Sequence, residues 1–230
     1  MAEVSEGIIA VSTAPVTVLR DEITPGRPRV TLHGLATVGC NVILSAMFFT
    51  SIVRLGSAHI TNAADIIWAV GAALMGLFVL VRSAPKTELV NLATLSTTAG
   101  MMLLPGLLRA ETNPGQWLDH VGEAVEITGV LLTQLSRIYL GRSFGLLPAN
   151  RGIVSGGPFR LVRHPVYLGW LILTIGFTMV NLSVHNVLVT LVVLPFMFAR
   201  IAQEETLLEA DPEYRAYREH TRYRLLPGLL

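Results

Sequence analysis

The stretch RLVRHPVYLGW, residues 160–170, places Arg160, Arg163 and His164 directly before Pro165, where a long apolar run begins. An arginine can hold a carboxylate through two parallel hydrogen bonds. Proline suits the first turn of a helix, and it pushes the preceding residue into an extended conformation. The next amides have no acceptor within the helix, so they can receive a carboxylate. The stretch therefore predicts a ligand site, although a basic collar that snorkels toward lipid headgroups is equally compatible.

A second charged cluster begins with Arg200, Glu204 and Glu205, where another apolar run ends. Arg200 and Glu204 are one helical turn apart and could pair on one face of a helix. The sequence Asp211-Pro212-Glu213 then predicts a new helix with aspartate at its cap. An amphipathic helix on anionic lipid would explain the arginines that follow. It explains the adjacent glutamates poorly, because an anionic surface repels them.

The composition predicts an integral membrane protein. Of 230 residues, 52% are hydrophobic and only 14% are charged, and the mean hydropathy is +0.57. A soluble domain carries roughly a quarter charged residues. The net charge of +1 excludes a strong global field for nucleic acid. The single cysteine, Cys40, cannot form an internal disulfide or a zinc cage, and we expect no metal site.

The apolar runs predict an all-α, multi-pass transmembrane helix bundle, because a spanning helix needs about 20 apolar residues. About six spans are expected, at residues 32–53, 62–81, 89–108, 120–140, 165–182 and 184–202. Only the turn Asn181-Leu182-Ser183 separates the last two, so they form a C-terminal helical hairpin. We divide the chain into a flexible N-terminal tail (1–31), N-terminal transmembrane helices (32–136) and a C-terminal core that holds the site (137–230).

The arginines and lysines predict the orientation of these spans. Fifteen of the seventeen fall on one side of the six-span arrangement, and only Arg54 and Arg109 fall on the other. The positive-inside rule assigns the rich side to the cytosol. Both termini and the 141–163 loop are therefore expected in the cytosol, with the site at the cytosolic face of the membrane.

The fourth predicted span carries Glu123, Glu126, Gln134 and Arg137 along one face. Ionisable residues within a membrane usually face the interior of the helix bundle and have a function. No motif joins these four residues, however, so packing between helices is the favoured interpretation.

Several motifs together resemble the isoprenylcysteine carboxyl methyltransferase family. They are Asn150-Arg151-Gly152, the run GPFRLVRHPVYLG at 157–169, Arg200, Glu204-Glu205, Tyr214, Tyr217 and a closing Arg-x-x-Pro. The resemblance covers residues 137–230, and its signature is RHPxYxG followed about thirty residues later by Arg and Glu-Glu. Two positions depart from the family pattern: Phe159 stands where the family usually has tyrosine, and His220 stands where an arginine is expected.

The resemblance implies a membrane methyltransferase with an S-adenosylmethionine pocket at the cytosolic ends of the last two spans. Glu205 would meet the ammonium group of this cofactor. Arg163 and Arg222 would hold a carboxylate, on the cofactor or on the methyl acceptor, and are the implied catalytic residues. The implied cofactor-binding residues are His164, Pro165, Tyr167, Leu168, Glu204, Glu205 and Tyr217.

Methyl transfer from a sulfonium is an in-line displacement that needs alignment more than acid–base help. A carboxylate acceptor is already ionised at neutral pH, so it needs no base. A lipid-like acceptor such as isoprenylcysteine, or a smaller one, would enter laterally from the bilayer. Two other functions remain open from the sequence: an NADPH-dependent sterol-type membrane reductase, and a non-catalytic membrane subunit or transporter whose arginines contact lipid.

Overall fold

The computed structural model describes residues 39, 70–71, 73, 85–111 and 117–228. The chain divides into a unit of residues Met1–Thr31 and a unit of residues Leu32–Leu230, and every described residue belongs to the second. The predicted N-terminal tail lies outside the described residues, as do nearly all residues of the predicted spans 32–53 and 62–81.

The described residues are mostly helical, which confirms the main feature of the predicted fold. The helices are α3 (Leu92–Leu103), α4 (Trp117–Leu140), α5 (Pro165–Val180), α6 (Val184–Leu208) and α7 (Pro212–His220). Short 3-10 turns lie at Leu104–Leu107, Gly141–Ser143 and Gly157–Arg160. The two-residue strands β1 (Thr87–Glu88) and β2 (Ala149–Asn150) pair antiparallel, with Thr87 opposite Asn150.

One helix in the described part of the chain, α6, is long and apolar enough to cross a membrane. It has 25 residues and continues beyond the predicted end at residue 202, so its last turns carry Glu204 and Glu205. Helix α5 and the helical stretch Leu92–Leu107 are shorter apolar helices. The six-span count and the orientation therefore stay predictions.

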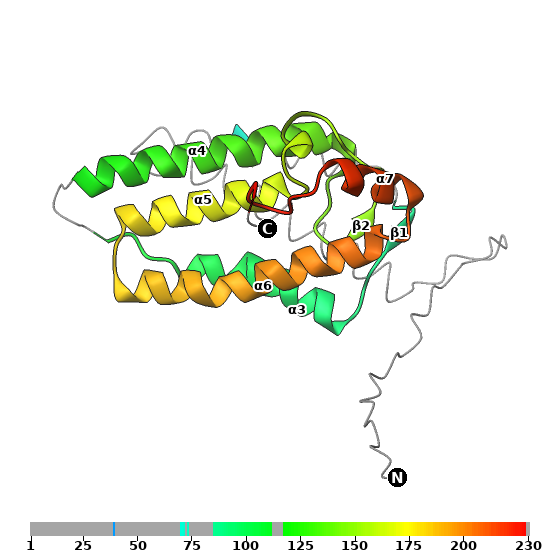
Figure 1. The fold of residues 1–230 in the computed structure, drawn as a ribbon. Helices are drawn as coiled ribbons and strands as arrows, with labels where there is room; N and C mark the ends of the chain where they lie inside the picture. Colours follow the sequence, from blue (N-terminus) through cyan, green and yellow to red (C-terminus); the bar gives the residue numbers. More distant parts are fainter. Residues whose placement is uncertain (1–38, 40–69, 72, 74–84, 112–116, 229–230) are drawn as a thin grey trace, which may run out of the picture. The chain divides into compact units, whose positions relative to one another are not determined.

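Helices α4 and α5 lie side by side and run antiparallel, and α6 lies beside α3 (Figure 1). Glycines allow the backbones of α4 and α5 to touch. A Cβ atom added at Gly129 would lie 2.7 Å from the carbonyl oxygen of Gly169, and one at Gly169 would lie 2.6 Å from the amide nitrogen of Thr133. Small residues at such positions permit close approach between helices in membranes.

The turn between α5 and α6 is fixed by side-chain hydrogen bonds. The Ser183 hydroxyl accepts from the amide of Asn186 and caps α6, as serine often does at helix starts. The Asn186 side chain donates to the carbonyl of Asn181 at 2.7 Å and to that of Arg109 at 2.9 Å. The predicted C-terminal hairpin is therefore present. The backbone of Arg109, which follows α3 and the 3-10 turn Leu104–Leu107, is hydrogen-bonded to the turn of this hairpin.

Candidate active site

The two charged clusters meet where α5 begins and α6 ends. The Arg163 amide donates to the carbonyl of Tyr223 at 2.8 Å, and the His164 amide donates to that of Arg224 at 2.9 Å. His164 lies outside the helical region of backbone conformation, as expected for a residue before proline, and α5 starts at Pro165. The closing segment of the chain therefore runs beside the start of α5.

Arg163 is buried and is bonded entirely within the protein. Its Nε donates to Oε1 of Glu205 at 2.8 Å, and its Nη1 donates to the carbonyls of Thr221, at 2.9 Å, and Arg222. The other carboxylate oxygen of Glu205 accepts from Nε of Arg224 at 2.8 Å. The guanidinium of Arg163 thus ties α6 and the closing segment to the start of α5.

A second buried ion pair joins Arg200 and Glu204, with Nε and Oε1 3.0 Å apart. The Tyr167 hydroxyl donates to the same carboxylate oxygen at 2.6 Å. The remaining donors of Arg200 bond the hydroxyl of Thr98 and the carbonyl of Leu146. These bonds connect α6 to α3, to α5 and to the loop after α4.

A cavity opens beside the Arg200–Glu204 pair. Its polar lining consists mainly of Arg137, Arg151, Arg163, His164, Tyr167, Arg200 and Glu204. Its apolar lining includes Met101, Met102, Leu140, Phe144, Leu147 and Trp170. An apolar pocket with a few convergent polar groups is typical of small-molecule binding sites.

The structure brings four of the nine predicted site residues to this cavity: Arg163, His164, Tyr167 and Glu204. The other five, Pro165, Leu168, Glu205, Tyr217 and Arg222, are not part of its lining. Pro165 starts α5, and Leu168 packs against a core cluster that contains Met197 and Leu225. Glu205 lies behind the lining, between Arg163 and Arg224.

The tyrosines of α7 act as hydrogen-bond donors. The Tyr217 hydroxyl donates to the carbonyl of Phe159 at 2.6 Å, and the Tyr214 hydroxyl donates to Glu205 at 3.4 Å. Burial raises the pKa of Tyr217 to about 12, and burial also raises the pKa of Tyr214. Both hydroxyls therefore stay protonated at neutral pH, so neither tyrosine is a base there.

Arg224 belongs to the closing Arg-x-x-Pro motif, whereas the arginine predicted to hold a carboxylate was Arg222. The side chain of Arg222 is exposed, and only its carbonyl joins the cluster, whereas the side chain of Arg224 reaches Glu205. Residues two apart in an extended segment point to the same side. The spacing alone therefore could not decide between these two arginines.

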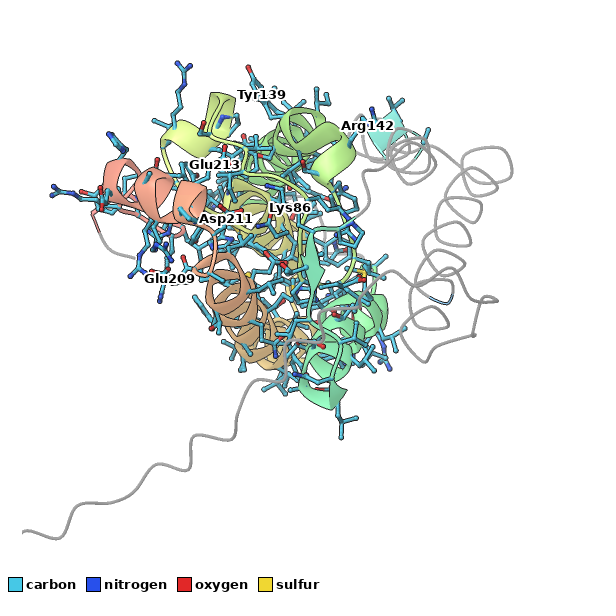
Figure 2. All side chains as sticks on the ribbon, turned by 90° about the vertical axis from the view of Figure 1, so that its right-hand side faces the viewer. Lys86, Tyr139, Arg142, Glu209, Asp211 and Glu213 are labelled. Atoms are coloured by element: carbon cyan, nitrogen blue, oxygen red, sulfur yellow. The ribbon has the colours of Figure 1, made fainter. Side chains whose placement is uncertain are left out.

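The β1–β2 pair holds the start of α7. The Asp211 carboxylate caps the helix by accepting from the Glu213 amide at 2.9 Å. It also accepts a hydrogen bond from the side chain of Asn150 at 2.6 Å and lies 3.7 Å from Nζ of Lys86. Figure 2 labels Asp211, Lys86 and Glu213 in this region. The hydrogen bond from Asn150 is the main reason that the pKa of Asp211 lies below its usual range.

Residues 127–210 match the model of the isoprenylcysteine carboxyl methyltransferase (ICMT) family. The matched region contains Arg163, Tyr167, Arg200 and both glutamates. The resemblance to the ICMT family that the motifs predict is therefore confirmed.

Several curated relatives match about half of the chain, and two of them match it over 124 residues as follows. Protein-S-isoprenylcysteine O-methyltransferase A of Arabidopsis thaliana is 34% identical, over 51% of this chain and 60% of the relative. A probable protein-S-isoprenylcysteine O-methyltransferase of Oryza sativa subsp. indica is 32% identical, over 50% of this chain and 64% of the relative. The chain thus covers somewhat less than two thirds of the length of each.

The structure of a eukaryotic intramembrane Ras methyltransferase, ICMT, is also similar. It is 18% identical, with a TM-score of 0.46, over 87% of this chain and 88% of that one.

Proposed function

We propose that the protein is an integral membrane methyltransferase that moves a methyl group from S-adenosylmethionine to the carboxylate of an isoprenylcysteine. The match of residues 127–210 to the ICMT family carries this proposal, because those residues supply most of the cavity lining. The names of the curated relatives favour an isoprenylcysteine over other lipid acids.

The donors and acceptors around the cavity fit S-adenosylmethionine. The Glu204 side chain is 22% exposed and lines the cavity, where it can accept from an ammonium or a hydroxyl group. The ring of Tyr167 lies 5.8 Å from that of His164 on the same lining, and the face of a tyrosine ring attracts cations such as a sulfonium. These three residues would hold the cofactor, which supplies an activated methyl group.

The reaction requires alignment and no proton transfer. S-adenosylmethionine, held by Glu204, His164 and Tyr167, would supply its methyl group to an ionised carboxylate oxygen of the acceptor, and the electron pair of the carbon–sulfur bond would stay on sulfur. The absence of a base among the tyrosines of α7 suits this chemistry. The apolar lining from Met101, Met102 and Trp170 suits a prenyl chain.

The predicted site residues outside the lining have a positioning role in this proposal. Glu205 and Tyr217 hold the closing segment and α7 against the start of α5, while Pro165 and Leu168 fix that helix in the core. We retain Arg222 as a candidate for holding an acceptor carboxylate from the exposed side of the closing segment.

We further propose the six-span arrangement, with the cavity at the cytosolic face. The support is the division of arginine and lysine between the two sides of the predicted spans. A prenylated protein made in the cytosol would reach a site at that face.

The function is tested with the purified protein in detergent, tritiated S-adenosylmethionine and N-acetyl-S-farnesylcysteine. We expect label in a base-labile ester, and no label when the acceptor is already the methyl ester. Thermal unfolding should shift upward with S-adenosylhomocysteine and not with NADPH. A shift with NADPH alone would support the reductase, and the absence of both shifts and of transfer would support a non-catalytic subunit.

A further inference from the structure

We propose that Arg137 of α4 binds a carboxylate inside the cavity and orients it for methyl transfer. The inference rests on the proposed function and deepens it. The resemblance to the ICMT family implied that Arg163 and Arg222 hold a carboxylate. The contacts in the structure favour Arg137 for this role instead.

Ion pairing separates Arg137 from the other arginines of the cavity. Four arginines line the cavity, and three of them are paired with a carboxylate of the protein. These pairs are Arg163 with Glu205 at 2.8 Å, Arg200 with Glu204 at 3.0 Å, and Arg151 with Glu88 at 3.6 Å. A guanidinium whose donors already bind a carboxylate has less capacity to bind a second one.

Arg137 has no carboxylate partner in the described part of the chain. Its Nη1 donates to the side-chain oxygen of Gln134 at 3.3 Å, and its guanidinium lies 6.0 Å from the centre of the Phe144 ring. Its Nε is buried and has no hydrogen-bond partner among the described residues. Because burying an unpaired charge is costly, an anion that enters the cavity would be strongly favoured at this position.

The surroundings of Arg137 fit the acid end of a lipid. Leu140, Phe144 and Trp170 line the same cavity, so an apolar chain can lie beside the guanidinium. Two carboxylates are available under the proposed function: that of the isoprenylcysteine and that of the methionine part of the cofactor. In both cases the N–H groups of the Arg137 guanidinium would donate two parallel hydrogen bonds to the two oxygens of the carboxylate.

The test compares ligands with and without the carboxylate, using Arg137→Gln in the full-length protein. We expect binding of N-acetyl-S-farnesylcysteine to weaken at least about tenfold, and binding of its methyl ester to stay unchanged, because a hydrogen bond to a charged group is stronger than one between neutral groups. Arg137→Lys should retain more of the affinity than Arg137→Gln, because lysine keeps the positive charge although it cannot donate two parallel hydrogen bonds. The control is Arg160→Gln, which removes an exposed arginine outside the cavity lining.

A second pair of ligands identifies the source of the carboxylate. If Arg137→Gln weakens S-adenosylhomocysteine but not its decarboxylated analogue, the cofactor supplies the carboxylate and the inference holds. Equal weakening of acid and ester, or no change with any ligand, would overturn it. If the wild-type protein neither binds the farnesylated acid nor transfers methyl groups, the proposed function itself fails and the inference falls with it.

Discussion

Glu204 and Glu205 are adjacent in the sequence, yet their carboxylates face different surroundings. The Glu204 side chain is 22% exposed and lines the cavity beside Arg200, whereas that of Glu205 is 9% exposed and lies between Arg163 and Arg224. Successive residues of an α-helix point about 100° apart because the helix has 3.6 residues per turn. One glutamate can therefore serve a ligand while its neighbour holds the protein together.

We predict that Glu204→Gln and Glu205→Gln fail in different ways. Glu204→Gln should weaken S-adenosylhomocysteine binding at least about tenfold, by loss of a charged hydrogen bond, with a smaller fall in unfolding temperature than Glu205→Gln, because Arg200 keeps its hydrogen bonds to Thr98 and Leu146. Glu205→Gln should instead lower the unfolding temperature markedly, because Arg163 and Arg224 lose their shared counter-ion. Calorimetric titration and thermal unfolding in detergent measure both effects. Loss of ligand binding in Glu205→Gln without a loss of stability would instead place Glu205 at the cofactor.

Arg163→Lys should also destabilise the protein, although it retains the charge. A lysine cannot donate at once to Glu205 and to the two carbonyls of the closing segment. Breaking a buried ion pair costs about 3–5 kcal/mol, and we expect Arg163→Ala to approach this loss in the free energy of unfolding. Denaturant unfolding followed by tryptophan fluorescence checks it. Arg160→Ala is the matched control, and an equal loss there would favour a basic collar at the membrane over a defined cluster.

At the scale of elements, two contacts position the site. The first is the approach of α4 to α5, which aligns the cavity wall around Arg137 with the start of α5. The second is the tether of α7 to the β1–β2 pair through Asp211 and Asn150. Both depend on a few small or polar residues.

We predict that Gly129→Ala separates α4 from α5. The new Cβ would lie 2.6 Å from Cα of Leu173 and 2.7 Å from the carbonyl oxygen of Gly169, both of which are backbone atoms that cannot rotate away. Overpacking of this kind costs about 1–3 kcal/mol, which should appear as a lower unfolding temperature. Gly106→Ala is the control, because a Cβ there meets no atom within 4 Å. Similar unfolding temperatures for the two variants would contradict the close contact.

The tether of α7 should depend on pH. The pKa of Asp211 is lowered in the folded protein, so its contribution to stability is fully present above the ordinary aspartate pKa of about 3.9. That contribution is lost as the pH falls through the lower, folded value. At neutral pH, Asp211→Ala should cost about 1 kcal/mol through loss of the helix cap. The difference in unfolding free energy between wild type and variant should shrink below about pH 4; a constant difference would count against the charged tether.

At the scale of the whole described unit, the two ends of the helices differ. One end carries the ion pairs, the cavity and α7, and the other carries the asparagine bonds at the α5–α6 turn. Arg109, one of the two basic residues predicted on the non-cytosolic side, lies at the asparagine end. This agrees with the orientation that we propose.

Cysteine labelling tests the orientation. In a Cys40→Ser background, single cysteines at the exposed residues Ser155 and Glu219 should react with an impermeant maleimide only from the cytosolic side. A cysteine at the exposed residue Glu111 should react only from the opposite side. Labelling of all three from one side would overturn the six-span arrangement.

The elements were more predictable than the contacts between them. Apolar runs and turn residues placed the α5–α6 hairpin and the helix starts at Pro165 and Pro212 correctly, because these are local properties of the chain. The sixth predicted span ends at residue 202, before the charged residues Glu204 and Glu205. Within the structure, buried ion pairs satisfy those charges, and the helix continues to Leu208.

The sequence by itself determined the apolar composition, the main helices of the described region and the motif residues that gather at one end of them. Only the tertiary structure decided which cations distant in the sequence meet which carboxylate: Arg163 and Arg224 meet Glu205, while Arg137 meets no carboxylate among the described residues. The physical reason is distance along the chain. Arg163 and Glu205 are 42 residues apart, and their contact depends on how closely the helices pack, which no local pattern records.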